Sequence, residues 1–407
     1  MHILLLSLWY TPEPVAKPHD LAVELTRRGH QVTVITGFPN YPHGELYAGY
    51  QVGWRWEETI DGVRVLRVWH VIDRSHSAVR RILSYATFSL RAVLAGLRLA
   101  PRPDVLWTYQ IGMPGVLLSW LKRVPLVHEV QDLWPEWALT SGVGLRGWLF
   151  NLLNKQERFI YRRAQAITTI SEGFRRTLTS KKQVSSSKIA LIPNWANEEN
   201  FKPVPRDEAL AQREGLAGRF NIIYGGNLGT AQGLHTVLEA ARQLSDLPGV
   251  QFILIGDGVE RERLLAEARF TRLDNVRFLG SRPPQQMADY LACADALLIH
   301  LLPDPMYAIT IPSKTYGYLA SGKPILAAAL GDVADLVQQL QAGKVCQPGN
   351  AATLADAVRQ LYHMPVEQRE ALGSHGRAAF EQQYTRAVLV KKYEMLFEEV
   401  TGHYVQR

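Results

Sequence analysis

The sequence is poor in cysteine and contains no long hydrophobic run. Its 407 residues include 2 cysteines, Cys293 and Cys346, too few for a disulfide framework and without a neighbouring Cys or His at zinc-ligand spacing. Nowhere do about 18 apolar residues follow one another, as a spanning helix needs. The first residues, MHILLLSL, lack the basic leader and the cleavage site of a signal peptide. We therefore expect a cytoplasmic protein with reduced thiols, at most attached to a membrane face.

The composition is that of an ordinary globular protein with a mild excess of positive charge. Hydrophobic residues make up 47% and charged residues 20%, which excludes disordered and fibrous classes. At roughly 100–200 residues per domain, the length predicts two or three domains. The net charge of +7 suits an anionic substrate, an anionic membrane surface or nucleic acid. Because the sequence has no nucleic-acid recognition motif, we expect no nucleic-acid partner.

Short apolar runs alternate with longer helical patterns, which indicates parallel sheets covered by helices. The pattern occurs twice, separated by a polar, proline-broken stretch after Ile192. We predict Rossmann-like domains at 1–195 and 196–380 and a helical tail at 381–407. A helix is expected over Asp20–Arg28, ended by Gly29. The predicted strands are Ile3–Leu8, Gln31–Thr36, Val63–Trp69, Asp104–Tyr109, Leu126–Val130 and Ala166–Ile170, then Asn221–Tyr224, Gln251–Ile255, Val276–Leu279, Ala296–His300 and Pro324–Ala328.

Two glycine turns in the second domain follow strands. One comprises Gly225, Gly226, Asn227, Leu228 and Gly229 and continues to Gln232 and Gly233, and the other comprises Gly256, Asp257 and Gly258. Glycines there let backbone N–H groups approach an anion, and the helix that follows favours negative charge. A glycine turn can also be a matter of topology alone, but two turns at equivalent strand ends favour a phosphate site.

A third element of this domain is the start of a helix at Pro312, Ser313 and Lys314. A lysine there would face the same space and could neutralise a diphosphate, although a solvated lysine is the alternative. We also include Arg282 among the residues expected to bind the donor.

Several of these segments together resemble family 4 glycosyltransferases of the GT-B fold, over nearly the whole chain. They are Gly29–Thr36, Ile255–Gly258, Asn275–Gly280 and Pro312–Pro324. Gly37–Pro42, Asp132–Glu136 and Ile311–Lys314 resemble more narrowly the branch with colanic-acid and N-acetyl-L-fucosamine transferases of bacterial polysaccharide assembly.

The resemblance implies an α/β protein with two Rossmann-like domains facing each other across a cleft. It implies a nucleotide diphosphate sugar, of the UDP-N-acetylhexosamine type, on the second domain and a polyprenyl-diphosphate-linked saccharide as acceptor on the first. It further implies a retaining transfer with no metal and no cofactor, and a last helix that crosses back to the first domain.

The sequence departs from the family at several positions. Asn227 and Gln232 stand where relatives carry positive charge, and Ile309 and Gly317 stand where many have a pair of glutamates, so Lys314 is the main lysine left for the diphosphate. Gln131 replaces a histidine. We interpret His128 as structural and Asp132, at the carboxyl end of a strand, as the catalytic candidate beside Lys314.

The first domain has features suited to a lipid-linked acceptor. Prolines make the segment from Thr11 to Asp20 a stiff loop, with Lys17 and His19 near a helix start where a phosphate could rest. Asn40 and Tyr41 would lie beside it, and a plain surface loop is the alternative.

Two stretches combine arginines with aliphatic and aromatic residues. The first contains Arg80, Arg81, Arg91 and Arg98, and the second runs from Arg146 through Arg163. They predict contact with the inner face of the cell membrane, although helices that cover a core would look alike. Two other functions stay open: a nucleotide-sugar epimerase, and a non-catalytic subunit that binds sugar nucleotide.

Overall fold

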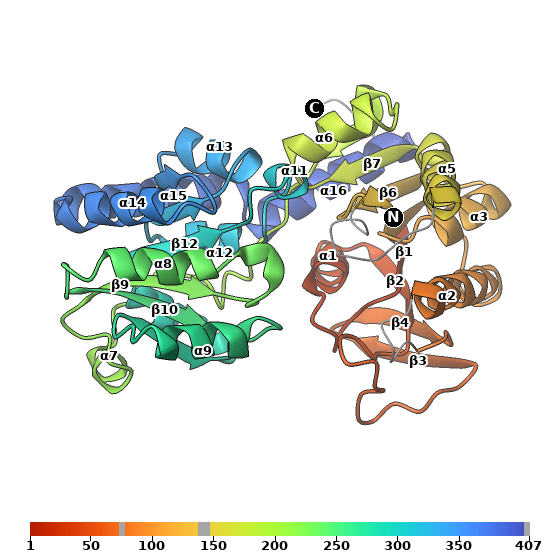
Figure 1. The fold of residues 1–407 in the computed structure, drawn as a ribbon. Coiled ribbons are helices and arrows are strands. Elements are labelled where there is room, and N and C mark those ends of the chain that lie inside the picture. Colours follow the sequence, from red (N-terminus) through yellow and green to blue (C-terminus); the bar gives the residue numbers. More distant parts are fainter. Residues whose placement is uncertain (73–77, 137–146, 403–407) are drawn as a thin grey trace. The chain divides into compact units, whose positions relative to one another are not determined.

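A computed structural model of the chain describes residues 1–72, 78–136 and 147–402. The chain divides into two compact units. The first unit comprises Met1–Ile170, Phe174–Pro193 and the chain from Leu389 onward, and the second comprises Ser171–Gly173 and Asn194–Val388. Each unit contains a mainly parallel sheet flanked by helices (Figure 1), which confirms the prediction of two Rossmann-like domains.

The described residues of the first unit form an eight-stranded sheet in the order β3-β4-β2-β1-β5-β6-β7-β8, with only β3 antiparallel to its neighbour. Its central strands are buried on both faces, as their runs of Val, Ile and Leu require. The strands are β1 (His2–Ser7), β2 (Gln31–Gly37), β3 (Arg55–Ile60), β4 (Val63–Val68), β5 (Val105–Tyr109), β6 (Leu126–Val130), β7 (Ala166–Thr169) and β8 (Ile189–Leu191).

Helices cover both faces of this first sheet. In Figure 1, α2, α3 and α5 lie on one face, and α1 lies on the other with α16. Leu389 and the residues after it in α16 belong to this unit. The helices are α1 (Ala16–Arg27), α2 (Ala78–Arg98), α3 (Met113–Lys122), α5 (Gly147–Arg163), α6 (Glu172–Ser180) and α16 (Arg386–Thr401).

The second unit contains a six-stranded parallel sheet in the order β11-β10-β9-β12-β13-β14. Two apolar clusters fill its two faces, one under α10, α12 and α13 and the other under α8, α9 and α14. The strands are β9 (Phe220–Gly225), β10 (Val250–Ile255), β11 (Val276–Gly280), β12 (Ala296–His300), β13 (Ile325–Ala328) and β14 (Gly343–Cys346). The helices are α7 (Glu208–Arg213), α8 (His235–Gln243), α9 (Arg261–Phe270), α10 (Met287–Ala292), α11 (Pro305–Ala308), α12 (Lys314–Ser321), α13 (Asp332–Gln339), α14 (Ala351–His363) and α15 (Val366–Gln383).

Strand order reverses direction once in each sheet. In the first sheet this occurs between β1 and β5, and in the second between β9 and β12. Loops that leave the carboxyl ends of neighbouring strands diverge at such a point and open a crevice, where ligands of this fold class bind. The site should therefore be sought in the loops after these strands.

The predicted strands are confirmed, with ends that shift by at most one residue. The structure adds three strands that were not predicted. The strand β3 is polar and exposed at the sheet edge, β8 has only 3 residues, and β14 contains Gly343 and Lys344 and is only half-buried. The prediction for the first helix was wrong at its start: α1 begins at Ala16, so Lys17 and His19 lie inside it. Pro18 is tolerated because N–H groups of a first helical turn have no intrahelical partner.

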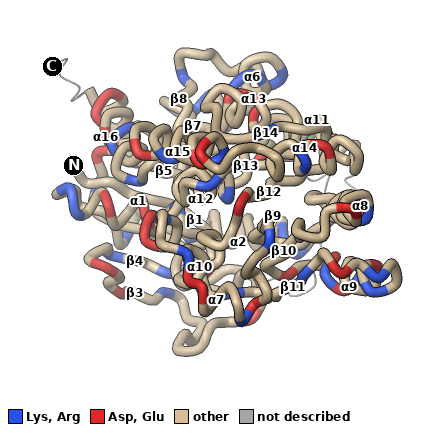
Figure 2. Tube along the Cα trace, turned by 90° about the vertical axis from the view of Figure 1, so that its left-hand side faces the viewer, with Lys and Arg blue, Asp and Glu red and all other residues tan. Residues whose placement is uncertain are grey.

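None of the helices in the described part of the chain combines the length and the hydrophobicity of a membrane-spanning segment. Some helices carry charges of both signs. Figure 2 shows this for α9, where Arg261 and Arg263 form ion pairs with nearby glutamates. Arg146, predicted to begin the second basic stretch, lies outside the described residues.

Candidate functional site

The two glycine turns of the second unit interlock. The Gly226 N–H donates to the Ile255 carbonyl over 2.8 Å, and the Leu228 N–H donates to the Asp257 carbonyl over 2.8 Å. A Cβ on Gly256 would lie 1.9 Å from the Gly226 carbonyl oxygen, so no other residue fits there without moving the backbone. The turns after β9 and β10 therefore form one loop pair at the switch point of the sheet.

Lys314 brings an ammonium group to this loop pair. Its Nζ is buried and has no hydrogen-bond partner among the described residues. It lies 3.7 Å from the centre of the Tyr224 ring, and a Cβ on Gly226 would approach it to 2.9 Å. Burial lowers the pKa of Lys314 to about 7. A buried cation without a counter-charge is costly, and an anion bound at the glycine turn would supply that charge.

Tyrosines fix the backbone around the ammonium. The Tyr318 hydroxyl, one turn into α12, accepts from the Gly225 N–H over 2.8 Å, and the Tyr224 hydroxyl donates to the Asn227 carbonyl over 2.6 Å. Because α12 starts at Lys314, the helix that carries the lysine also holds the glycine turn. Lysine and turn are thus positioned as a unit before any ligand arrives.

Most of the other predicted donor-binding residues belong to the glycine turns or to the start of α12, and Arg282 does not. Gln232 accepts from the Gly229 N–H over 3.1 Å and closes the turn, after which Gly233 takes a left-handed conformation. Leu228 is buried, whereas Asn227, Asp257 and Ser313 are exposed and Pro312 is half-buried. Arg282 contacts residues outside the loop pair. It donates to the Tyr290 hydroxyl over 2.7 Å, and its guanidinium lies 3.5 Å from the Glu214 carboxylate.

Of the two positions where many relatives carry a glutamate, Ile309 and Gly317, the packing around Gly317 explains why a glutamate is absent there. Gly317 lies within α12 against the ring of Phe201, and a Cβ there would lie 2.9 Å from that ring. A glutamate at this position would therefore displace Phe201. Ile309 packs beside Gly173, and its carbonyl accepts from Ser171.

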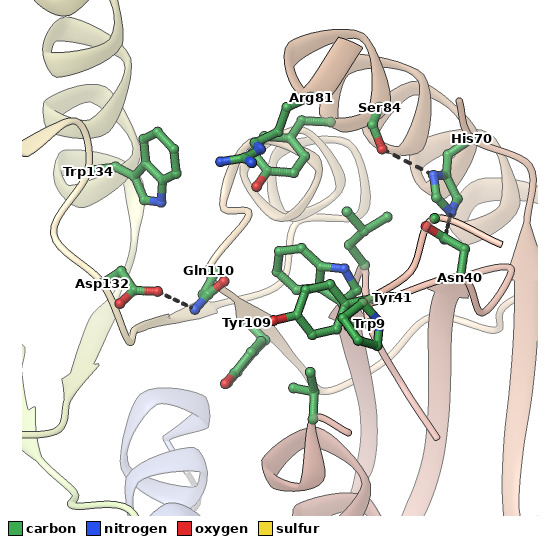
Figure 3. Close-up of a pocket in the computed structure, with 15 residues that line it drawn as sticks. Trp9, Asn40, Tyr41, His70, Arg81, Ser84, Tyr109, Gln110, Asp132 and Trp134 are labelled. Atoms are coloured by element: carbon green, nitrogen blue, oxygen red, sulfur yellow. Dashed lines mark hydrogen bonds between the residues drawn. The ribbon is translucent and has the colours of Figure 1, made fainter. Parts of the chain in front are cut away.

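A cavity of about 340 Å³ lies at the carboxyl ends of β1, β2, β5 and β6 in the first unit. We name it the acceptor cavity. Figure 3 shows Asp132 and Gln110 joined at one end and Asn40 and His70 joined at the other, with the rings of Trp9, Tyr41 and Tyr109 between. Its lining also includes Arg81, Ser84, Tyr85 and Trp134. Aromatic faces with a few polar groups are the lining that saccharides and other small ligands use.

Asp132 is the carboxylate of the acceptor cavity. It accepts from the Gln110 Nε2 over 2.9 Å. Burial raises the pKa of Asp132 to about 6, and the bond from Gln110 opposes this only in part. At neutral pH the group is mainly ionised, so it can accept a hydrogen bond from a ligand hydroxyl.

Glu13 positions the predicted residues Asn40 and Tyr41. This buried carboxylate accepts from the Asn40 and Tyr41 N–H groups, both over 2.8 Å, and from the Tyr10 N–H over 3.0 Å. Asn40 in turn contacts the His70 Nε2 at 3.2 Å. The loop after β2 is therefore tied to the loop after β1, and both line the cavity.

The prediction that Lys17 and His19 meet an acceptor phosphate does not agree with the structure. The Lys17 ammonium is 7% exposed and pairs with Glu129 at 2.7 Å. His19 contacts the Tyr10 hydroxyl at 3.1 Å and Asp61 at 3.1 Å. Neither residue lines the acceptor cavity. The reason is the earlier start of α1, which turns Lys17 into the interior.

Glu129 is the centre of a buried network. Besides Lys17, the side chains of Gln131, Thr168 and Tyr393 donate to it. Although burial raises the pKa of Glu129, the Lys17 ammonium and the hydroxyl donors together hold it below its usual value. The network joins α1, β6, β7 and α16, so Gln131 serves structure here.

His128 lies within β6 as predicted, fully enclosed and 2.8 Å from the Thr108 hydroxyl. Burial lowers the pKa of His128 to about 4, so it stays neutral. The sequence did not reveal the site residues Glu13, His70, Tyr109, Gln110, Trp9 and Trp134. Their position in the sequence could have indicated three of them, because Trp9, Gln110 and Trp134 each follow the end of a predicted strand within a few residues.

The chain is similar to known proteins in sequence and in fold. Residues 15–195 match the family model described as Glycosyl transferase 4-like domain, and residues 207–379 match the model described as Glycosyl transferases group 1. A protein of Escherichia coli K12 carrying the name putative colanic acid biosynthesis glycosyl transferase WcaI is 28% identical over 388 residues, which are 90% of this chain and 93% of that protein.

Solved structures share the fold. Sucrose-phosphate synthase from Thermosynechococcus elongatus has a TM-score of 0.75 at 17% identity, over 99% of this chain and 100% of that one. Anabaena HepE in complex with UDP has a TM-score of 0.71 at 18% identity, over 98% and 100%. The predicted GT-B fold class is confirmed.

Proposed function

We propose that this chain, which belongs to the glycosyltransferases that combine a 4-like domain with a group 1 domain, transfers a sugar from a nucleotide diphosphate sugar to a polyprenyl-diphosphate-linked saccharide in surface polysaccharide assembly. The donor is of the UDP-N-acetylhexosamine type, and the configuration at the anomeric carbon is retained. Support for the pathway comes from the colanic acid name of a relative, and support for UDP from the HepE complex.

The observation that carries the proposal is the unpaired ammonium of Lys314 beside the glycine turn. A diphosphate bound by the turn gives this cation the partner it lacks. During transfer, negative charge grows on the leaving diphosphate, so the ammonium and the backbone N–H groups stabilise the transition state more than the ground state. The second unit therefore supplies leaving-group stabilisation.

In the transfer, the bond between the anomeric carbon and the diphosphate oxygen breaks, and a bond from the acceptor oxygen to that carbon forms. The acceptor hydroxyl proton passes to an oxygen of the leaving phosphate. The bonds and the proton of this transfer are all accounted for without a metal or a cofactor. Asp132 orients the acceptor hydroxyl by accepting a hydrogen bond, and Asn40 and Tyr41 contact the acceptor saccharide.

The first unit also has a surface suited to an anionic membrane. Large apolar side chains on α2, α3 and α5 are solvent-exposed, including Leu90 at 61%, Trp120 at 73% and Trp148 at 65%. Arg80 and Lys155 are exposed on two of the same helices. Exposed tryptophans with arginines and lysines are typical of helices that rest on a membrane, here the cytoplasmic face.

The test begins with thermal shifts in a panel of nucleoside diphosphates and their sugars, followed by turnover with extracted lipid acceptors. We expect one sugar nucleotide to stabilise the wild type, and its nucleoside diphosphate to be formed as product only when an acceptor takes up the sugar. The variant Lys314→Met should lose about 100-fold or more in kcat. An exposed-lysine variant, Lys202→Met, is the matched control.

Three results would contradict the proposal. Conversion of the sugar nucleotide without any acceptor would identify an epimerase. Binding without turnover across the panel of donors and acceptors would identify a non-catalytic subunit. Near wild-type turnover in Lys314→Met would remove the lysine from the reaction.

A further inference from the structure

A second cavity of about 350 Å³ lies between α2 and α5 of the first unit. We name it the apolar groove. Its walls are mainly aliphatic: Ile82 and Ala86 come from α2, Leu153 and Ile160 from α5, and Ile111 and Met113 from the segment after β5. These residues offer a ligand a mainly apolar surface, although Ser89 and Gln156 also line the groove.

The apolar groove adjoins the acceptor cavity. Arg81, Tyr85, Gln110 and Trp134 line both. Gln110 is also the residue that donates to Asp132, so the groove begins one side chain away from the candidate catalytic carboxylate. Arg81, labelled in Figure 3 among the residues of the acceptor cavity, also lines the groove, so a phosphate joining a polar group to an apolar group would find a cation there.

Glu157 is the carboxyl group in the lining of the groove, and it lies beside the ammonium group of Lys182. The Lys182 ammonium lies 2.7 Å from Glu136 and 3.2 Å from Glu157, and it also donates to the Trp134 carbonyl over 3.0 Å. Burial raises the pKa of Glu157 to about 8. With Glu136 already paired to Lys182, a protonated Glu157 adds no negative charge to the wall of the groove in neutral solution.

We propose that the apolar groove holds the first isoprene units of the acceptor's lipid chain, with the diphosphate at the boundary beside Arg81 and the saccharide in the acceptor cavity. The inference rests on the proposed function of the acceptor cavity. The three parts of such an acceptor, apolar, anionic and hydroxyl-rich, meet apolar walls, a guanidinium and an aromatic cavity in that order. Ile82 of the groove is itself exposed, and Leu152 and Trp148 are exposed on α5, the helix that also carries Leu153 and Ile160, so the rest of the chain can continue into a membrane.

The probe is farnesyl diphosphate, compared with inorganic pyrophosphate by calorimetry. The full-length protein is first saturated with the nucleoside diphosphate that the thermal-shift panel selects, so that the glycine turn is occupied. We expect farnesyl diphosphate to bind about tenfold more tightly or better, a ratio that requires burial of only about two methylene groups. Ala86→Trp, at an exposed position that lines the groove, should reduce the ratio to near one.

Leu90→Trp is the matched control, because Leu90 is on α2 and exposed but does not line the groove. Ile82→Asn is a second groove variant in case Ala86→Trp does not fold. Equal affinities for the two probes, or an equal loss in Leu90→Trp, would overturn the inference. So would a change of oligomeric state in Ala86→Trp without a change in the affinity ratio, since the groove would then be a protein contact. Failure of turnover with every lipid acceptor contradicts the proposed function but does not alter this ratio.

Discussion

Replacing Lys314 by methionine should stabilise the unliganded protein. The pKa of its ammonium falls from 10.5 to about 7 on burial. Each pKa unit corresponds to about 1.4 kcal/mol, so the charged side chain opposes folding by about 4 kcal/mol at pH 7. Methionine keeps much of the apolar stem and removes the charge, and the free energy of unfolding should rise by up to that amount.

The pH dependence of this gain has a defined sign. Between pH 7 and 10.5 the unfolded chain binds more protons at Lys314 than the folded chain does, so wild-type stability rises with pH across this window. The advantage of Lys314→Met is therefore largest at pH 7 and below, and it shrinks to about 1 kcal/mol near pH 9.5.

Urea unfolding of wild type, Lys314→Met and the exposed control Lys202→Met at three pH values measures this difference without any nucleotide. Adding the selected nucleoside diphosphate should stabilise the wild type and have little effect on Lys314→Met. A Lys314→Met variant no more stable than the wild type at pH 7 would refute the reasoning, because the ammonium would then already have a partner.

Three further predictions concern other residues. Asp132→Asn should lower kcat/KM for the acceptor by about 100-fold and remove the loss of activity that the wild type shows as the pH falls below about 6, where this carboxylate takes up a proton; pH–rate profiles of both proteins measure it. Lys17→Met should cost about 3–5 kcal/mol in urea unfolding because the buried Glu129 carboxylate loses its counter-charge, and adding Glu129→Gln should restore part of that loss. Gly226→Ala should weaken nucleotide binding about tenfold or more in calorimetry, since its Cβ would lie 2.9 Å from a lysine ammonium at a φ of 137°, whereas Gly218→Ala, with open space around it, should lower stability alone.

Much of the fold could be predicted from the sequence because buried parallel strands leave continuous apolar runs. The runs at Ile3–Leu8 and Gln251–Ile255 have this form and are strands in the structure. The start of α1 could not be predicted in the same way, since a proline in a first helical turn resembles a loop proline. The edge strand β3 was missed because one exposed face gives it a polar pattern.

Of the site, the sequence predicted single segments but not their contacts. Each glycine turn was visible, yet their interlocking at Gly226 and Gly256 depends on strands β9 and β10 being neighbours. The burial of the Lys314 ammonium likewise depends on Tyr224, which is distant in sequence. Lys17 was assigned a surface role because its partner, Glu129, lies more than a hundred residues away.

The central claim is that the glycine turn and Lys314 together hold the diphosphate of the donor. A crystal structure with the selected nucleoside diphosphate bound tests it most directly. The account predicts phosphate oxygens within hydrogen-bond distance of the Lys314 Nζ and of backbone N–H groups in the turn after β9. A diphosphate bound elsewhere, with the ammonium still unpaired, would contradict it.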